Sequence, residues 1–315
     1  MSVIGSKRGA FWEDNGFLVL PAFFSEEEIS GVQAAYDRTW SVPPTDVVVD
    51  DLVTGRRCRI GDLDEVERGH HFKVNDLYLT EEAIRNVVLS ERMGMVLEEL
   101  LGDEPAICNT LSFDKGSEQA DHLDTLYMTP VSERGLVATW MALEDTLPAA
   151  GPLRYYPGSN HIAPYRFSNG SMHTVAAEMS QWSDYMAAQV DDQRLEEQRF
   201  MARRGDLFVW HALLLHGGSG IADVSLTRQS LVTHYWTQTD CEKTNWDLRP
   251  APGGWWIKRP PQEVPGGSPP AGQESLTIDS DEQTVDFPAS LSRTHPSSGQ
   301  PDLRERMNAL QEAIG

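Results

Sequence analysis

Residues 119–127 contain the feature that most constrains the fold, a histidine and an aspartate two positions apart, His122 and Asp124. In an extended strand, side chains at positions i and i+2 point to the same face of a sheet. The spacing therefore brings an imidazole nitrogen and a carboxylate oxygen together on one side of a strand, as two corners of a metal site. A histidine and an aspartate at this spacing also arise by chance as a surface or capping pair, so the remaining ligands decide between the two interpretations.

A third ligand is needed because two groups alone hold a metal weakly. The best candidate is His216, which directly precedes a Gly-Gly-Ser turn at residues 217–219. His211 is the alternative, but two histidines five positions apart face opposite ways on a regular strand. We therefore expect His211 to be a buried packing residue near the site. Two histidines and one carboxylate leave three coordination positions open, an arrangement typical of non-haem Fe(II) oxygenases.

Arg228 follows His216 at the start of an apolar run, residues 229–236. A guanidinium at this place can bind a carboxylate through two parallel hydrogen bonds. A dicarboxylate co-substrate is what this type of iron chemistry needs, so Arg228 is a candidate for its anchor.

The order of these motifs resembles that of the Fe(II)/2-oxoglutarate oxygenases, and of the phytanoyl-CoA dioxygenase family in particular. The resemblance covers most of residues 10–236. Residues 17–25 are similar to the opening strand and helix entry of that family, and residues 140–145 and 151–160 to its core strands and Pro-Gly-Ser turn. Two departures are a second glycine after His216, which moves the expected serine to Ser219, and Leu123, where many relatives have glutamine.

The resemblance implies that His122, Asp124 and His216 bind Fe(II) and form the catalytic centre. It also implies a set of cofactor-binding residues, which are Arg228, Trp140, Ser219 and Lys73. Lys73 stands in a Phe-Lys-Val-Asn-Asp segment and resembles a lysine that holds 2-oxoglutarate in this family, although it could also be an ordinary surface lysine.

The implied reaction consumes 2-oxoglutarate and O2, releases succinate and CO2, and hydroxylates an unactivated C–H bond of a small molecule. Asp124 favours hydroxylation, because relatives that halogenate lack this carboxylate. Desaturation, cyclisation or epimerisation at the same centre are alternatives. A cupin-like metal isomerase or hydrolase would not need Arg228, and a non-catalytic binding module would have no use for open coordination positions.

Hydrophobic patterning predicts a mainly β protein with flanking helices around a double-stranded β-helix, the cupin-like jelly roll. A capping box of Ser25 and Glu28 begins a helix that ends before Pro43. Residues 45–67 are expected to form a hairpin over the mouth of the site. Further helices are expected at 7–15, 90–101 and within 174–198, and strands at 17–21, 105–114, 119–128, 136–145, 152–156, 199–202, 206–216 and 227–237.

Composition shifts near residue 240. We expect residues 1–240 to form the oxygenase domain and residues 241–315 to be a Pro/Gly-rich segment with a terminal helix at 301–314. This segment is expected to pack on the core or to join a partner subunit in a homodimer. Its adjacent indoles, Trp255 and Trp256, are expected either to close over the mouth of the barrel or to form an interface.

The net charge of −22 argues against nucleic acid and anionic membranes as partners, and makes a polyanionic acyl-CoA substrate less natural. Three widely spaced cysteines do not form a disulfide or zinc framework, and this agrees with a reducing compartment. A signal peptide and an apolar run of membrane-spanning length are both absent, so we expect a cytoplasmic location. The remaining single histidines are expected to be structural or exposed, and these are His161, His173, His234 and His295.

Overall fold

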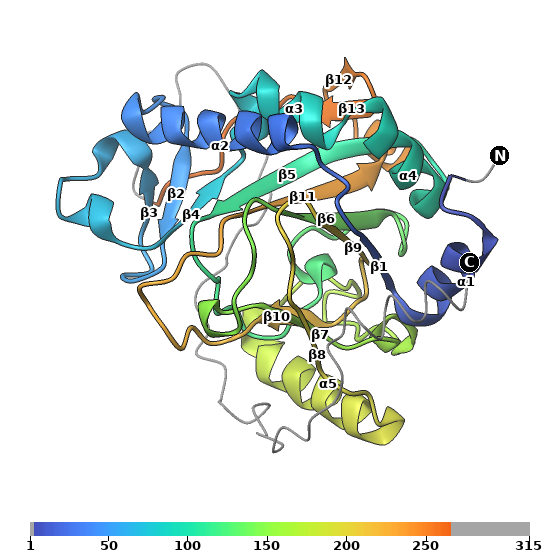
Figure 1. Cartoon of the computed structure of the whole chain (residues 1–315). Helices are drawn as coiled ribbons and strands as arrows, with labels where there is room; N and C mark the ends of the chain where they lie inside the picture. Colours follow the sequence, from blue (N-terminus) through green and yellow to red (C-terminus); the bar gives the residue numbers. More distant parts are fainter. Residues whose placement is uncertain (1–2, 266–315) are drawn as a thin grey trace.

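The computed structural model describes residues 3–265, and its core is a pair of mainly antiparallel sheets (Figure 1). The larger sheet has the strand order β1-β9-β6-β11-β5-β4-β2-β3, with β13 beside β5 and β12 beside β13, and the smaller sheet has the order β10-β7-β8. The predicted fold class, a double-stranded β-helix with flanking helices, is confirmed. The strands are β1 Phe17–Leu20, β2 Val48–Asp51, β3 Arg57–Arg59, β4 Phe72–Asn75, β5 Pro105–Phe113, β6 Leu136–Ala142, β7 Leu153–Tyr155, β8 Gln198–Phe200, β9 Leu207–His211, β10 His216–Gly218, β11 Ser230–Thr237, β12 Leu248–Ala251 and β13 Gly254–Ile257.

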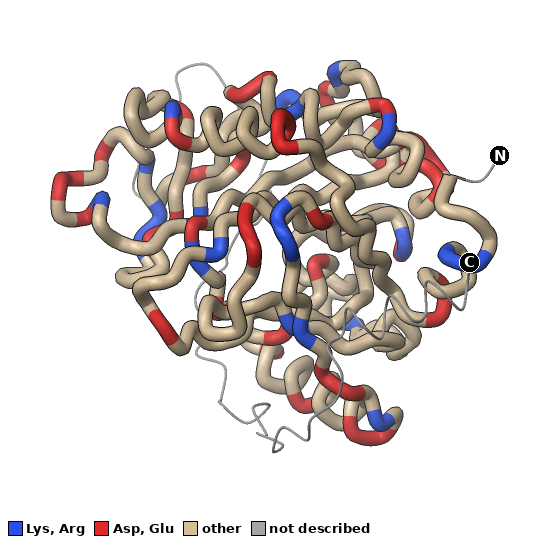
Figure 2. The backbone as a smooth tube through the Cα atoms, viewed as in Figure 1, with Lys and Arg blue, Asp and Glu red and all other residues tan. Residues whose placement is uncertain are grey.

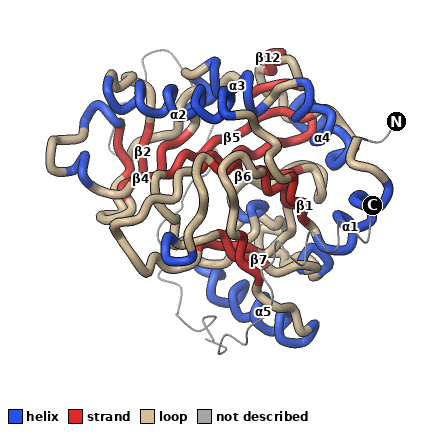
Figure 3. Tube along the Cα trace, viewed as in Figure 1, coloured by secondary structure: helices blue, strands red, loops and turns tan. Residues whose placement is uncertain are grey.

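Helices cover the outer faces of both sheets (Figure 3). The α-helices are α1 Ser6–Asn15, α2 Glu26–Ser41, α3 Glu82–Val88, α4 Glu91–Leu101, α5 Met179–Gln193 and α6 Gln238–Lys243. The predicted capping box is present, since the Ser25 side chain accepts from the Glu28 backbone and the Glu28 side chain accepts from the Ser25 backbone. Helix α4 ends at Gly102, which takes the left-handed conformation that a residue with a side chain rarely adopts. Capping thus fixes where these helices begin and end.

Strand β6 contributes apolar side chains to both faces of the large sheet. Val137 and Met141 pack in the cluster beneath the helices, whereas Ala138, Trp140 and Ala142 pack between the two sheets. Because alternate residues of a strand point to opposite faces, both sets must be apolar for a sheet that is covered on both sides. The space between the sheets is therefore filled mainly by aromatic and aliphatic side chains, and the functional pocket opens within it.

The predicted strand at residues 119–128 is wrong. Only His122 makes a β-bridge, and the chain then enters a 3-10 turn at Asp124–Leu126. Leu123 and Leu126 are three residues apart and pack in the same cluster with helix α5, which a turn permits and a strand does not. Packing against that helix therefore outweighs the strand-like alternation of the sequence.

The predicted single strand at residues 206–216 is also wrong, because it consists of two strands in different sheets. Strand β9 ends at His211 in the large sheet, the chain turns, and β10 begins at His216 in the small sheet. Leu214 donates its backbone N–H to the carbonyl of His211 and so closes this turn. The residues between the strands are all buried and apolar, which is why they resemble strand in the sequence.

Residues 45–67 form the expected hairpin, β2 and β3, at the end of the large sheet, and none of them lines the described pocket. The indoles of the C-terminal segment also lie away from the pocket. Trp255 donates to Glu104, and the Trp256 ring lies under the guanidinium of Arg85. Strand β13 thus extends the large sheet beside β5, and the expected closure by the two indoles is wrong.

The division of the chain at residue 240 stays a prediction, and the expected helix at 301–314 and His295 lie outside the described residues. Acidic and basic residues are both spread along the described part of the chain (Figure 2). The full sequence contains 48 acidic and 26 basic residues. Within residues 3–265, every helix is too short or too polar to cross a lipid bilayer.

Replacing Gly94 by alanine should destabilise the protein, although alanine is normally the better helix former. A methyl group at Gly94 would lie 2.2 Å from the carbonyl oxygen of Gly253, in the turn between β12 and β13. We expect a loss of about 1–3 kcal/mol in the free energy of unfolding from overpacking. Gly31 in α2 is the control, because nothing lies within 4 Å of its added methyl group, and Gly31→Ala should gain roughly 0.5–1 kcal/mol. Urea unfolding measures both changes, and equal effects of the two substitutions would contradict the packing shown.

Candidate metal centre

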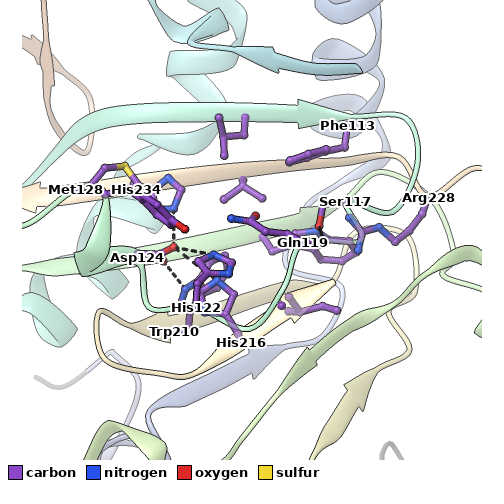
Figure 4. A pocket seen from close by; sticks show the side chains of 16 residues that line it. Phe113, Ser117, Gln119, His122, Asp124, Met128, Trp210, His216, Arg228 and His234 are labelled. Atoms are coloured by element: carbon purple, nitrogen blue, oxygen red, sulfur yellow. Dashed lines mark hydrogen bonds and ion pairs between the residues drawn. The ribbon is translucent and has the colours of Figure 1, made fainter. Parts of the chain in front are cut away.

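His122, Asp124 and His216 meet at one end of the pocket between the sheets (Figure 4). Asp124 Oδ1 lies 3.7 Å from His122 Nε2 and 3.6 Å from His216 Nε2. One potential ligand atom from each residue lies within 4.8 Å of those of the other two, and all three side chains are buried. The structure thus brings together the three residues that the sequence singled out.

Backbone pairing holds the two histidines side by side. His122 donates its N–H to the carbonyl of His216 over 2.8 Å, and His216 donates to the carbonyl of His122 over 3.1 Å. The ring centroids are consequently 4.3 Å apart. A single bridged pair therefore sets the spacing of both imidazoles.

The second glycine after His216 is explained by the close approach of residues 117–121. A side chain at Gly217 would lie 2.7 Å from Asp121 Oδ1, and one at Gly218 would lie 2.5 Å from Ser117 Oγ. Both distances are too short for a real Cβ atom, so glycine is required at both positions. Residues 117–121 pass close to both Gly217 and Gly218, and this explains why the sequence has two glycines where the His-Gly-Ser pattern has one.

Hydrogen bonds orient both imidazole rings. His122 Nδ1 lies 2.8 Å from the carbonyl oxygen of Ala120, and His216 Nδ1 lies 3.0 Å from that of Leu214. A carbonyl oxygen only accepts, so each Nδ1 carries the proton and each Nε2 has its lone pair available. This is the tautomer in which Nε2 binds a metal ion.

Asp124 is buried, yet it is held in the charged form. Burial alone would raise the pKa of its carboxyl, but the positive charge that His216 and His234 carry when they are protonated lowers it below its usual range, and a metal ion bound in place of those protons would act in the same direction. The indole of Trp210 donates to Asp124 Oδ2 over 2.7 Å. One carboxylate oxygen is thus held by Trp210, while Oδ1 faces the histidines.

Arg228 lies across the pocket from Asp124, before strand β11 (Figure 4). Its side chain is buried, one amino group donates to the carbonyl of Gly151 over 3.0 Å, and the guanidinium lies 5.4 Å from the centre of the Trp140 ring. Burial lowers the pKa of Arg228 to about 10, against the opposing charge of Glu144, so the group is still cationic at neutral pH. Among residues 3–265, Arg228 forms no ion pair with a carboxylate, and neither its Nε nor Trp140 Nε1 has a hydrogen-bond partner. A buried cation in this state is suited to an anionic ligand.

Lys73 and Ser219 are the two other predicted cofactor residues. Lys73 lies on β4, is buried, and places its Nζ 3.2 Å from Asp50 Oδ2. It pairs in register with Phe113, which lines the pocket, so its side chain points to the pocket side of the sheet. Ser219 follows β10 and is buried, with its hydroxyl unpartnered among the described residues. The roles of both residues stay predictions.

His234 was missed by the sequence reasoning, which treated it as structural or exposed. It is buried on β11 and lines the pocket, with Nε2 at 3.5 Å from Asp124 Oδ1. Arg228 and His234 are six positions apart, and the inward side of β11 contains Ser230, Val232 and His234. Extending the period-two pattern from Arg228 would have found it.

His211 is the buried packing residue that the sequence predicted. Its Nδ1 accepts from the backbone N–H of Leu213, and its ring meets Trp12 edge-on at 6.0 Å between centroids. Burial lowers the pKa of His211 to about 3, with smaller contributions from Arg134 and His161. It lies on the strand before the turn and takes no part in the cluster around Asp124.

Comparisons with known proteins indicate the family of this chain. The family model of phytanoyl-CoA dioxygenase (PhyH) matches residues 12–222. The peroxisomal phytanoyl-CoA dioxygenase of Mus musculus is 23% identical over 258 residues, which cover 76% of this chain and 70% of the mouse protein.

Solved structures share the fold at low sequence identity. The 2-oxoglutarate-dependent carbocyclase SnoK from nogalamycin biosynthesis superposes with a TM-score of 0.57 at 16% identity, over 75% of this chain and 85% of SnoK. EctD from S. alaskensis with bound Fe gives a TM-score of 0.54 at 17% identity, over 85% of each chain. The epimerase SnoN gives 0.53 at 18% identity, over 73% of this chain and 82% of SnoN.

The chain therefore belongs to the phytanoyl-CoA dioxygenase family. It is an enzyme, an Fe(II)/2-oxoglutarate-dependent oxygenase, with O2 as the second co-substrate. The residues present fit this chemistry, because two imidazole nitrogens and one carboxylate oxygen are a donor set suited to Fe(II). The buried guanidinium of Arg228 lies on the wall of the same pocket.

His211 should make the stability of the metal-free protein depend on pH. Its pKa is lower in the folded than in the unfolded chain, so the unfolded chain binds a proton first and stability falls as pH drops below about 6.5. Between pH 6.5 and 5.5 we expect the wild type to lose about 1 kcal/mol more than His211→Gln, whose amide oxygen still accepts from Leu213 but does not titrate. Urea unfolding at the two pH values gives this difference, and parallel losses would show that His211 is not held neutral.

Proposed function

We propose that His122 Nε2, Asp124 Oδ1 and His216 Nε2 bind the Fe(II) ion of this oxygenase. The three atoms converge from two segments, both imidazoles are in the tautomer that leaves Nε2 available, and the carboxylate is charged. Two neutral nitrogens and one anionic oxygen on one side of the ion leave the opposite side open to co-substrates.

We further propose that Arg228 anchors the distal carboxylate of 2-oxoglutarate. The observation that carries this proposal is a buried guanidinium without a carboxylate partner among residues 3–265, on the wall of the pocket that contains the three ligands. The Trp140 ring beneath it contributes a cation–π contact and fixes the plane of the fork. Lys73 and Ser219 complete the proposed cofactor-binding set, since Lys73 lies on the pocket side of the sheet and Ser219 has an unpartnered hydroxyl.

When bound, Fe(II) supplies the oxidising chemistry that converts 2-oxoglutarate and O2 to succinate and CO2 while the substrate is oxidised. The residues of the chain orient the proposed metal ligands and keep water away from them. Trp210 holds Asp124 Oδ2, the carbonyls of Ala120 and Leu214 hold the imidazole rings, and the sheets exclude water on both sides.

We propose hydroxylation of an unactivated C–H bond as the reaction. The presence of Asp124 supports it, since a carboxylate ligand leaves no place for a halide at that position. Cyclisation and epimerisation, the activities named for SnoK and SnoN, and desaturation are alternatives that would use the same residues.

The substrate we propose is an uncharged or cationic small molecule and not a CoA ester. The net charge of −22 disfavours a polyanion, and Arg228 is the one cationic side chain that lines the described pocket. We also propose a cytoplasmic location, which agrees with Cys58, Cys108 and Cys241 all being free thiols. Homodimerisation through the C-terminal segment is a further proposal.

Formation of succinate from 2-oxoglutarate tests the proposed function directly. Protein supplied with Fe(II) and O2 should release succinate, and the rate should fall to background without Fe(II). Protein that turns over no 2-oxoglutarate, even with a panel of small neutral substrates, would contradict the proposal.

Asp124→Ala should abolish coupled turnover and weaken metal binding by more than about 100-fold, because only two neutral imidazoles remain to hold the ion. Titration with Co(II), followed by absorption, measures the affinity without turnover. Asp223→Ala, at an exposed aspartate, is the control and should change nothing. Substrate oxidation by Asp124→Ala at a near wild-type rate would show that the ligand is another residue.

Arg228→Gln should raise the KM for 2-oxoglutarate by about 10- to 100-fold, since a charge-assisted contact of roughly 1.5–3 kcal/mol is lost. The Co(II) affinity should stay within about twofold, because no ligand changes. Arg199→Gln on β8 is the control, as this arginine is exposed and pairs with Glu197. An unchanged KM would place the anchor elsewhere, with Lys73 the next residue to replace.

A further inference from the structure

A series of buried polar side chains leads from the C-terminal segment to the candidate metal centre. It begins at Asp76, which directly follows β4 and has a buried side chain. Its Oδ2 lies 2.8 Å from the guanidinium of Arg259 and accepts from Gln262 Nε2 over 3.0 Å. Its Oδ1 accepts from Asn109 Nδ2 over 2.9 Å. The side chains of Arg259 and Asp76 are 5% and 3% exposed, so this ion pair is shielded from water.

The series continues through Asn109 to His234 and ends at Asp124. Asn109 Oδ1 lies 3.1 Å from His234 Nδ1, and His234 Nε2 lies 3.5 Å from Asp124 Oδ1. Asn109 and His234 are register partners on β5 and β11, immediately before the register of this pair of strands shifts. The sheet therefore holds the two middle members directly opposite each other.

The hydrogen bonds between these polar side chains each have a defined donor and acceptor. A carboxylate paired with arginine only accepts, so Asn109 must turn its amino group to Asp76 and its oxygen to His234. His234 must then donate from Nδ1, and it donates to Asp124 Oδ1 as well only as imidazolium, in which Nε2 also carries a proton. The charge of Asp76 thus sets the orientation of a ring that borders the carboxylate of the metal centre.

We propose that Arg259, Asp76, Asn109 and His234 act as a positioning relay, through which the C-terminal segment holds Asp124 in the geometry that binds the metal. This inference rests on the proposed metal site. His234 is a positioning residue here, because it is argued to act through Asp124.

The physical reason lies in the two oxygens of Asp124. Trp210 fixes Oδ2, but one hydrogen bond leaves the carboxylate free to rotate about that contact. The ring of His234 lies against Oδ1 and limits this rotation. Groups that orient a metal ligand in this way typically change metal affinity by about 10- to 100-fold when they are removed.

The relay also explains what residues beyond β13 contribute. Arg259 donates to the carbonyl of Cys108 on β5 as well as to Asp76, so the segment runs along the edge of β5. His234, Arg259 and Gln262 all lie beyond residue 222, where the match to the family model ends. The metal centre of this chain thus depends on residues outside the matched region.

Co(II) titration of the purified full-length protein tests the relay, with the KM for 2-oxoglutarate as a second measurement. Arg259→Met and Asn109→Leu should each weaken Co(II) binding by about tenfold, and Arg259→Lys, which keeps the charge, should restore most of the affinity. The KM for 2-oxoglutarate should stay within about twofold, because Arg228 is untouched. Gln262→Ala removes one hydrogen bond from a half-buried side chain but leaves the Asp76–Arg259 ion pair intact. It should therefore weaken Co(II) binding less, by about threefold.

Tyr78→Phe is the matched control. The Tyr78 hydroxyl donates to the carbonyl of Ile257, and phenylalanine keeps the ring that lies 5.9 Å from the Arg259 guanidinium, so the substitution loosens the same segment while the Asp76–Arg259 ion pair stays in place. We expect a lower unfolding midpoint and unchanged Co(II) affinity. Relay variants that bind Co(II) within twofold of the wild type, or a control that weakens binding equally, would overturn the relay. If Asp124→Ala binds Co(II) as tightly as the wild type, the proposed metal site itself would be overturned instead.

Discussion

The reciprocal backbone hydrogen bonds between His122 and His216 are the constraint on which the rest of the site depends. They join two segments that are distant in sequence, and they determine which neighbouring residues are tolerated. Gly217 and Gly218 have no side chains because residues 117–121 cross them at contact distance. Arg154 closes the same crossing, since its Nε binds Asp121 Oδ1 and its Nη1 binds the carbonyl of Gly218, both over 2.6 Å. The two imidazoles are therefore set by the backbone, and the side chains around them stabilise that setting.

Burial of both faces of the large sheet places the chemistry in the interior. One face is covered by α2, α3 and α4, and the other faces the small sheet, where the aromatic residues of β6 and β9 pack around the pocket. In such a medium a charged group needs a partner. Asp124 has the imidazoles and Trp210, and Asp76 has Arg259, whereas Arg228 has only the Gly151 carbonyl and the Trp140 ring among described residues. This cation without a carboxylate partner is therefore the place that we propose for the carboxylate of the co-substrate.

The sequence predicted most of the fold, because capping residues and period-two patterns are local signals. Ser25 with Glu28 gave the start of α2, and the alternation in residues 136–145 gave β6. It misassigned residues 119–128 and 206–216, where buried turns carry apolar side chains and resemble strand. The candidates His122, Asp124, His216 and Arg228 came from their spacing along the chain and from the family resemblance, and the structure brings all four to one pocket. His234 was not among them, because its neighbours Asn109 and Asp124 come from other segments and only the folded sheet brings them together.

Strand β13 has a consequence for how the chain behaves if its C-terminal segment is cut. Strand β5 is paired along one side with β11, but on its other side β4 covers only Leu111–Phe113 and β13 covers Ala106 and Ile107. Removing the hairpin would bare the backbone N–H and C=O groups of a long, apolar strand, which is a template for pairing with another molecule. Proteolysis before β12 would therefore leave part of β5 unpaired and make the chain prone to self-association and aggregation, independently of any loss of catalysis.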